Sequence, residues 1–223
     1  MDFLDPPPNI IIQPMQPGDV AEVVRVHLAS FPGFFLTFLG NDFLSLLYKS
    51  IQSDPIGYVL VASCNGQIQG FVAGVAQQSG FYRRLIEKHK WKFAFASAWP
   101  VVKKPHIAPK LLMALQKPAD VRDAAADACL MSIAVRPEAE GQGIGRQLFA
   151  ALYREFSAFG VPAICLTTGR DANERANRFY QRLGFELTRC FFTPEGRALN
   201  EYVIQDSGTK LIFESRADNG WLH

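Results

Sequence analysis

The sequence lacks the clustered cysteines and histidines that usually hold structural metal ions. Its four cysteines, at positions 64, 129, 165 and 190, lie far apart in strand-like runs, and no Cys-x-x-Cys pair occurs. Zinc and iron–sulfur sites are therefore not supported, and we expect no metal. We interpret the cysteines as buried free thiols of a protein that works in a reducing compartment.

Long apolar runs and a leader-like N-terminus are also missing. The chain begins MDFLDPPPN, which is acidic and broken by three prolines, unlike a secretory signal. No uncharged apolar run approaches the length that spans a bilayer. These features predict a soluble, cytoplasmic protein without a transmembrane segment.

The chain does contain enough apolar sequence for a substantial core. Of its 223 residues, 48% are hydrophobic, and the formal net charge of +2 suggests no partner by itself. No internal repeat or low-complexity stretch divides the sequence. We therefore expect a single domain over residues 1–223.

Alternating strand and helix patterns predict an α/β fold. Two buried strands, over 128–135 and 161–168, are each followed by a helical pattern, and Asn65-Gly66 marks a hairpin in the first half. The helices after the buried strands are expected over 141–160 and 173–183; further strands are expected over 9–15, 185–192 and 200–205, and further helices over 17–31 and 41–53. Together these elements predict a mixed sheet, α+β in character, flanked by helices.

The segment EGQGIGRQL, residues 140–148, places three glycines between a buried strand and a predicted helix. It matches neither the GxGxxG fingerprint of dinucleotide-binding proteins nor a P-loop. The first-turn amides, from Gln142 to Arg146, would point away from the chain, and the absent β-carbons would let a phosphate reach them. The pattern favours an anion site, although a tight turn without a ligand has the same composition.

A second candidate stretch is NERANRFYQRLGF, residues 173–185. Helical spacing places Asn173, Ala176 and Tyr180 on one side of the predicted helix. A tyrosine in this place can give its phenolic proton to a leaving group. The alternative is that Phe179 and Tyr180 are packing residues and that Asn173 only caps the helix.

In this order and separation, SIAVRPEAEGQGIGRQL and NERANRFYQRLGF resemble the Gcn5-related N-acetyltransferase (GNAT) superfamily, in detail from Cys129 to Phe185. The resemblance implies the acetyltransferase fold, with six or seven strands and a helical insertion, residues 79–127, between the third and fourth strands. It also implies acetyl-CoA as co-substrate. The CoA-binding residues that it implies are Ile133, Ala134, Val135, Gly141, Gln142, Gly143, Ile144, Gly145, Arg146 and Asn173.

The resemblance further implies direct acetyl transfer to an amine, without a covalent enzyme intermediate. The fourth and fifth strands, residues 129–136 and 162–168, would splay apart to admit the pantetheine. An amide near Ile133 or Ala134 would polarise the thioester carbonyl. Tyr180 would protonate the departing thiolate, and positioning would supply most of the catalysis.

The general base is left open. The two central strands offer no carboxylate, only Ser132, Thr167 and Thr168. The remaining choices are an ordered water, His27 or a carboxylate from elsewhere in the chain.

Glu140 departs from the family pattern, which usually has Arg or Gln at this position. A carboxylate would repel a pyrophosphate, so we expect Glu140 to turn outward. Arg136 or Arg146 would then supply the missing positive charge.

The aromatic loop FPGFFLTFLG, residues 31–40, falls where the family forms part of its acceptor pocket. Phe31, Phe34 and Phe35 are therefore candidates for stacking on a sugar or a base. The alternative is that they fill the core between two helices, as phenylalanines commonly do.

The insertion is rich in positive charge. Between Phe81 and Lys117 there are nine lysines and arginines and one acidic residue, whereas the rest of the chain has 14 basic and 20 acidic residues. This clustering favours an anionic acceptor such as a phosphorylated or nucleotide-linked amino sugar. A homodimer contact, an anionic membrane surface or a solvated helix face are alternatives. Nucleic acid is not expected, because no recognition motif accompanies the charge.

The competing function is a non-catalytic CoA-binding or scaffold protein that docks through the basic insertion. Release of a thiol from acetyl-CoA in the presence of amines would separate the two.

Overall fold

The structure is a computed structural model that describes residues 10–32, 35–81, 83–85, 87–88, 91–93, 95–96, 126–193 and 196–205. Phe34, the side chain of Phe35 and most of the basic insertion lie outside the described residues. The expectations on them therefore stay predictions, as does the division of the chain into one domain with an insertion.

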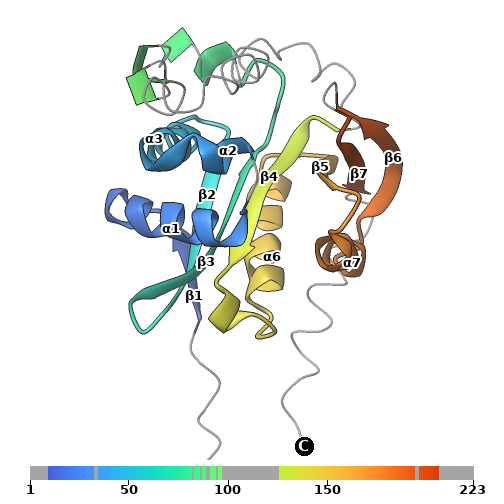
Figure 1. Cartoon of the computed structure of the whole chain (residues 1–223), viewed down its shortest axis with the longest axis horizontal. Helices are drawn as coiled ribbons and strands as arrows, with labels where there is room; N and C mark the ends of the chain where they lie inside the picture. The colour runs from blue at the N-terminus through green and yellow to red at the C-terminus, as the bar shows by residue number, and fades with distance from the viewer. Residues whose placement is uncertain are drawn as a thin grey trace, which may run out of the picture.

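Seven strands form one sheet in the order β1-β2-β3-β4-β5-β7-β6, with β4 near its middle (Figure 1). The strands are β1 (Ile11–Pro14), β2 (Gly57–Cys64), β3 (Gln67–Val75), β4 (Ala128–Val135), β5 (Ala163–Gly169), β6 (Glu186–Phe192) and β7 (Ala198–Gln205). The β4–β5 pair is parallel and the other pairs are antiparallel. The mixed sheet predicted from the sequence is confirmed.

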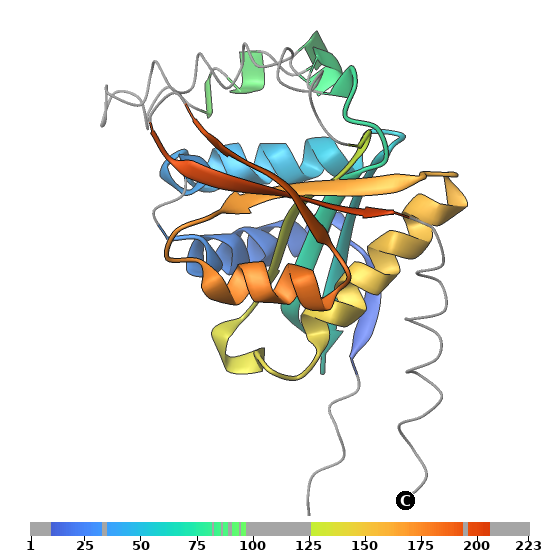
Figure 2. The ribbon, with the colours of Figure 1, turned by 90° about the vertical axis from the view of Figure 1, so that its right-hand side faces the viewer.

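Helices cover both faces of this sheet. They are α1 (Val20–Ser30), α2 (Phe35–Phe38), α3 (Gly40–Gln52), α6 (Ile144–Ala158) and α7 (Glu174–Arg182), with short 3-10 turns η1 (Pro17–Asp19) and η4 (Pro137–Ala139). Helices α1 and α3 contact β2, β3 and β4 from one side, and α6 contacts the same strands from the other. Helix α7 lies on the α6 side (Figure 2). Among the helices that the structure describes, none has an apolar stretch of the length that crossing a bilayer requires.

The hairpin and the alternating strand pattern explain how the core divides into two layers. Asn65 and Gly66 have φ of 49° and 76°, the left-handed conformation that a tight two-residue hairpin turn needs. Along β2, Val59 and Val61 belong to the core under α1 and α3, whereas the residues between and after them belong to the core under α6. The alternation of side chains along a strand supplies both layers at once.

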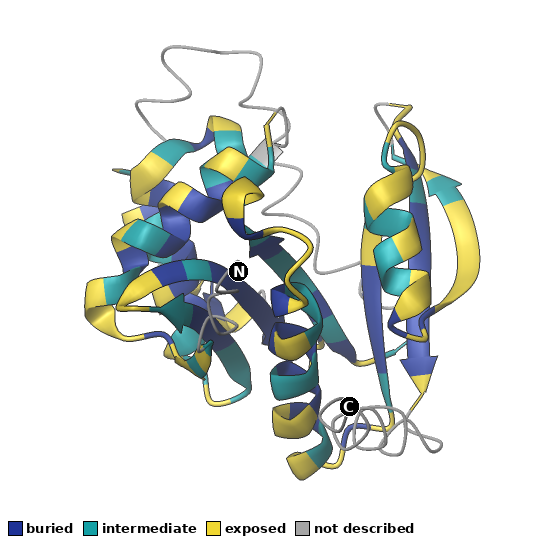
Figure 3. Cartoon of the chain, turned by 90° about the horizontal axis from the view of Figure 1, so that it is seen from below, coloured by how far each residue is buried: buried dark blue, intermediate teal, exposed yellow. Residues whose placement is uncertain are grey.

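The central feature of the sheet is the early separation of β4 from β5. The two strands pair only at Ala128 with Ile164 and at Cys129 with Cys165. Opposite β3, the register of β4 shifts so that Met131 has no partner, which is the pattern of a β-bulge. Beyond Cys129 the edge of β4 that faces β5 makes no ladder, so the predicted splaying of the two strands is confirmed. Seen from below, β5, β7 and β6 form a group with α7 beside the rest of the domain (Figure 3).

The described part of the basic insertion is attached to the core under α3. Phe81, Leu85 and Phe93 are buried, and the Phe93 ring lies 5.1 Å from that of Phe43. The described residues from Phe81 to Ala96 are helical, as the sequence predicts for this stretch.

Candidate active site

The loop between β4 and α6 forms one wall of the candidate site. Gly141 and Gly143 have φ of 81° and 76°, and Gly143 is the N-cap of α6. The helix therefore begins at Ile144, three residues later than the predicted start at 141, because the left-handed glycine ends the loop. The first helical bond at this end runs from the Gln147 N–H to the Gly143 carbonyl (3.1 Å). The amides of Ile144 and Gly145 precede it, so they are available to an anion.

Open space surrounds the first two glycines but not the third. A β-carbon on Gly141 or Gly143 would meet nothing within 4 Å, whereas one on Gly145 would lie 3.2 Å from the Phe179 ring. Gly145 is thus required for the contact between α6 and α7. The prediction that the missing β-carbons make room for a ligand is therefore wrong for Gly145, where the room is taken by Phe179. The Gly145 amide still belongs to the helix start.

The charges around the loop agree with the prediction at Glu140, which is exposed, and differ from it at Arg136. Glu140 pairs with Arg175 on α7 (2.6 Å), which neutralises the unexpected carboxylate. Arg136 pairs with Glu22 on α1 and donates to the Ile68 carbonyl (2.7 Å). The suggestion that Arg136 faces a pyrophosphate is therefore wrong, because both ends of its guanidinium are used within the protein. Arg146 is half-buried in the first turn of α6, which leaves it as the basic side chain at the helix start.

The register of β4 decides which of its amides face the open edge. The Arg136 N–H donates to Gln69 on the β3 side (2.7 Å). Because N–H directions alternate along a strand, the Ala134 N–H also faces β3, opposite Phe71. The N–H groups of Ile133 and Val135 then face the side from which β5 has separated. Of the two amides suggested from the sequence, Ile133 has the suitable direction and Ala134 does not.

The structure places Tyr180 among packing residues, which is one of the two alternatives that the sequence left open. It is half-buried, and its ring lies 5.4 Å from Phe179, 6.0 Å from Phe185 and 6.2 Å from Tyr202. Its hydroxyl has no hydrogen-bond partner among the described residues. Burial, with a smaller contribution from the negative charge of a Cys129 thiolate, raises the pKa of Tyr180 well above its usual value. The phenol is therefore protonated at neutral pH and has a proton to give.

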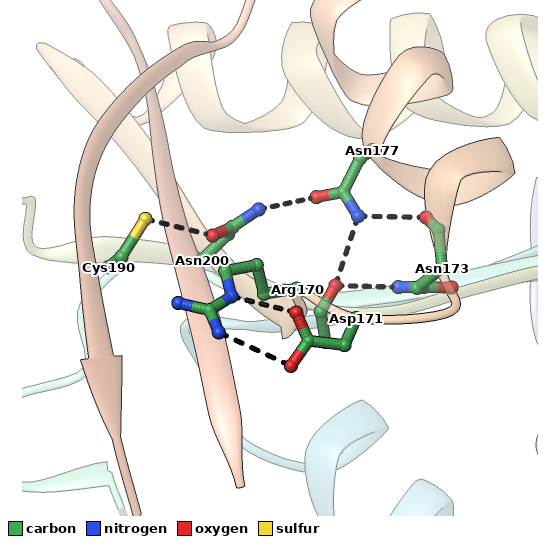
Figure 4. Close-up of polar contacts among 7 residues, drawn as sticks. Arg170, Asp171, Asn173, Asn177, Cys190 and Asn200 are labelled. Carbon is green, nitrogen blue, oxygen red and sulfur yellow. Dashed lines mark hydrogen bonds and ion pairs between the residues drawn. The ribbon is translucent and has the colours of Figure 1, made fainter.

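Asn173 stands at the N-cap of α7, but its side chain does not cap the helix. Its amide donates to the Thr168 hydroxyl (2.9 Å), at the end of β5. It also donates to the Gly169 carbonyl (3.1 Å) (Figure 4). The structure thus uses Asn173 to join α7 to β5, beside the edge that faces β4.

Asn177, one turn further along α7, was missed by the sequence prediction. Its side-chain carbonyl accepts from Asn200 and from the Tyr202 hydroxyl (both 2.9 Å). Its amide donates to the carbonyls of Gly169 (3.0 Å) and Asn173 (2.8 Å) (Figure 4). The i, i+4 spacing from Asn173 was the available signal. This network ties α7 to β5 and β7 and so fixes the helix that carries Tyr180.

Replacing Asn177 with Ala should destabilise the fold by about 2–5 kcal/mol, because the buried donors of Asn200 and Tyr202 would lose their acceptor. Urea unfolding of the two proteins would measure the difference. Arg178→Ala, an exposed change on the same helix, is the control and should cost much less. Equal losses in the two variants would contradict the structural role of Asn177.

Two thiols meet where β4 and β5 separate. Cys129 and Cys165 are register partners, and Cys165 accepts a hydrogen bond from the Gln78 amide (3.1 Å). The neighbouring Cys165 thiol and burial raise the pKa of Cys129, whereas the Cys129 thiol lowers the pKa of Cys165 against the opposing effect of burial. All four cysteines are free thiols. Within the described ranges, no group of three or more His, Cys, Asp or Glu side chains gathers as a metal site requires.

Phe31 belongs to the core layer under α1, and a buried carboxylate, Glu201, lies on β7 next to β5. Phe31 is half-buried, 4.7 Å from His27, and packs against the core, which is the alternative that the sequence left open for it. On β7, Glu201 is buried opposite Thr167 and pairs with Arg189 on β6 (2.7 Å). The sequence prediction missed this carboxylate, because only the sheet places β7 next to β5.

Solved structures share this architecture at low sequence identity. An N-acetyltransferase from Staphylococcus aureus Mu50 matches with a TM-score of 0.57 and 16% identity, over 88% of this chain and 98% of its own. Ard1 from Thermoplasma volcanium matches with a TM-score of 0.57 and 15% identity, over 88% and 97%. The acetyltransferase yncA from Salmonella typhimurium, solved with acetyl-CoA, matches with a TM-score of 0.56 and 16% identity, over 89% and 95%. At these identities the likeness establishes the fold, which is that of acetyltransferases.

The family of this chain is shown by its sequence. The model of the acetyltransferase (GNAT) family matches residues 22–185, from α1 to the end of the α7 region. The chain belongs to the acetyltransferase (GNAT) family, and it is an N-acetyltransferase that uses acetyl-CoA. Among curated protein sequences, none matches this chain.

Proposed function

We propose that this enzyme transfers the acetyl group of acetyl-CoA directly to the amine of a small phosphorylated or nucleotide-linked sugar, and that it acts in the cytoplasm. The observation that supports acetyl transfer most strongly is the separation of β4 from β5 next to the α6 helix start and Tyr180. Free thiols at all four cysteines agree with a reducing compartment.

The loop and the first turn of α6 fit the pyrophosphate of CoA. The two left-handed glycines leave open space at their α-carbons, and the exposed Gln142 lies between them. The amides of residues 141–146 would hold the pyrophosphate, with Arg146 as the nearby cation. The likeness to yncA, which was solved with acetyl-CoA, supports this placement.

The residues of this chain would do three things during transfer. The N–H groups of Ile133 and Val135 would hold the pantetheine and orient the thioester carbonyl, which acetyl-CoA supplies in activated form. Tyr180 would give its proton to the leaving thiolate. Asn173 and Asn177 would keep α7 in position for that step, because they bind it to β5.

The nature of the acceptor rests on charge. The basic insertion carries nine lysines and arginines against one acidic residue between Phe81 and Lys117. In its described part, Arg84 is used in an ion pair with Asp54 (3.1 Å), while Trp91 and Phe95 are 70% and 76% exposed. Exposed aromatic side chains beside positive charge suit a phosphorylated sugar or a nucleotide.

A panel of amines scored for thiol release from acetyl-CoA tests this proposal. The panel contains glucosamine 6-phosphate, a UDP-linked amino sugar, unphosphorylated glucosamine, spermidine and a short peptide with a free N-terminus. We expect release with the phosphorylated or nucleotide-linked sugars above all others. Preference for spermidine would overturn the acceptor class, and no release with any amine would favour a CoA-binding scaffold.

Reversing charge in the insertion should act on the acceptor alone. Lys103→Glu with Lys104→Glu should raise the KM for the acceptor, and the increase should shrink as salt rises, because charges are screened beyond about 10 Å at 0.1 M salt. Steady-state kinetics at several salt concentrations would measure this. The affinity for acetyl-CoA, measured by calorimetry, serves as the control. An unchanged acceptor KM together with a change of oligomeric state in sedimentation would instead indicate a homodimer contact.

A further inference from the structure

Helix α7 contacts the glycine loop and the start of α6 through two side chains that are one turn apart. Nη2 of Arg175 lies 2.6 Å from a carboxylate oxygen of Glu140, the residue before Gly141. A β-carbon on Gly145 would lie 3.2 Å from the Phe179 ring. Residues four positions apart lie on the same face of a helix, so one face of α7 borders the loop and the first turn of α6 (Figure 2).

The ion pair between Arg175 and Glu140 lies at the surface. The Arg175 side chain is 75% exposed, and Glu140 is exposed as well. Exposed ion pairs contribute little to stability, because water and salt screen them and two long side chains must be held in one geometry. The hydrogen bonds of Asn173 and Asn177 already attach α7 to β5. The position of this pair beside the loop therefore indicates a use in binding rather than in holding the fold.

The charges beside the loop decide whether an anion can approach it. Glu138 and Glu140 come shortly before the glycines, and both are exposed. Arg136 is bound elsewhere within the protein, so it does not offset them. Arg146 supplies one positive charge from the first turn of α6, and Arg175 supplies another from α7. Without Arg175, the two carboxylates would outnumber the positive charge at the loop and would repel a pyrophosphate.

The guanidinium of Arg175 can serve Glu140 and a ligand together. Arginine carries five N–H donors in a planar fork, and phosphate oxygens accept from two of them at once. The contact with Glu140 is made through Nη2, which leaves the fork with donors for a second oxyanion. The ion pair also keeps the long side chain beside the loop, so less freedom is lost when a ligand binds.

We propose that Arg175 binds the pyrophosphate of acetyl-CoA, with its guanidinium kept beside the glycine loop by the ion pair with Glu140. This inference rests on the proposed placement of the pyrophosphate on the amides of residues 141–146. It extends that site to a second element, because the amides come from the start of α6 and the cation from α7. It also gives the carboxylate at position 140 a place in the site.

Arg175→Ala tests the proposal through calorimetric titration with CoA. We expect the affinity to fall about 10- to 100-fold, as for loss of a hydrogen bond between charged groups. Arg178→Ala, which removes another exposed positive charge from α7, is the matched control and should change the affinity less than about threefold. Thermal transitions of both variants should stay close to that of the wild type, because both side chains are exposed. Equal affinities in the two variants would overturn the proposal.

A double variant separates direct contact from simple charge balance. Glu140→Gln combined with Arg175→Ala removes one charge of each sign, so the net charge beside the loop equals that of the wild type. If Arg175 contacts the pyrophosphate, the double variant should recover only part of the lost affinity, since the donors are still missing. Recovery of the full wild-type affinity would show that Arg175 only cancels the charge of Glu140, and would overturn the contact.

Dephospho-CoA identifies which phosphate is bound. It keeps the pyrophosphate and lacks the 3′-phosphate, so Arg175→Ala should weaken its binding by the same factor as that of CoA. A loss confined to CoA would assign Arg175 to the 3′-phosphate and overturn its assignment to the pyrophosphate. Failure of the wild-type protein to bind CoA at all would instead overturn the proposed function, and the role of Arg175 with it.

Discussion

Gly143→Val is expected to weaken acetyl-CoA binding on the order of 10²- to 10⁴-fold, because two or more charge-assisted bonds from loop amides would be lost. Gly143 has a φ of 76° at the N-cap of α6, and the space beside its α-carbon is empty of protein. A valine there would both occupy the space of the phosphate and disturb the directions of the amides that follow. Isothermal calorimetry with acetyl-CoA measures the loss.

Gly160→Val is the matched control for this change. Gly160 follows the other end of α6 and has the same φ of 76°, and a β-carbon added to it would likewise meet no protein atom within 4 Å. Both variants carry the cost of a side chain in the left-handed region, roughly 1–2 kcal/mol, so their thermal transitions should fall by similar amounts. Loss of binding in Gly143→Val alone supports the pyrophosphate site. Equal affinity in the two variants would contradict it.

Tyr180→Phe is expected to lower kcat by about 10²- to 10⁴-fold, the usual range for loss of a general acid, and less if the thiolate leaves easily. The ring packing against Phe179, Phe185 and Tyr202 would be kept, and the hydroxyl that is removed has no partner within the described structure. Acetyl-CoA affinity and stability should therefore change little. Because the pKa of Tyr180 is raised, the loss of this acid should not limit kcat until the pH exceeds the ordinary tyrosine value of about 10.

Tyr58→Phe provides the comparison for Tyr180. Tyr58 is also half-buried and packs against the same core, with its ring 5.7 Å from Phe156, but it lies on β2, away from the separated strands. Removing the Tyr58 hydroxyl should leave kcat unchanged. If Tyr180→Phe turned over acetyl-CoA as fast as Tyr58→Phe, Tyr180 would be a packing residue only.

Much of the site could be predicted because its signals are local. The glycine loop, the helix with Asn173 and Tyr180, and the two central strands are each defined by neighbouring residues, and the strand separation was expected from the family resemblance. Gly145 shows where this reasoning fails: its spacing matches a ligand loop, yet a β-carbon at this position would lie 3.2 Å from the Phe179 ring. No pattern within the loop distinguishes a glycine that serves a ligand from one that serves a neighbouring helix.

The sequence by itself determined the order of strands and helices along the chain and the hairpin at Asn65-Gly66, since these depend on residues close along the chain. The tertiary structure alone decided the partners of Arg136, which donates to Ile68 from 68 positions away, and the burial of Glu201 beside β5. It also decided the meeting of His27 with Tyr48, 21 positions apart. A side chain's partner depends on which elements the sheet places side by side, and that is set by packing of the whole core rather than by local spacing.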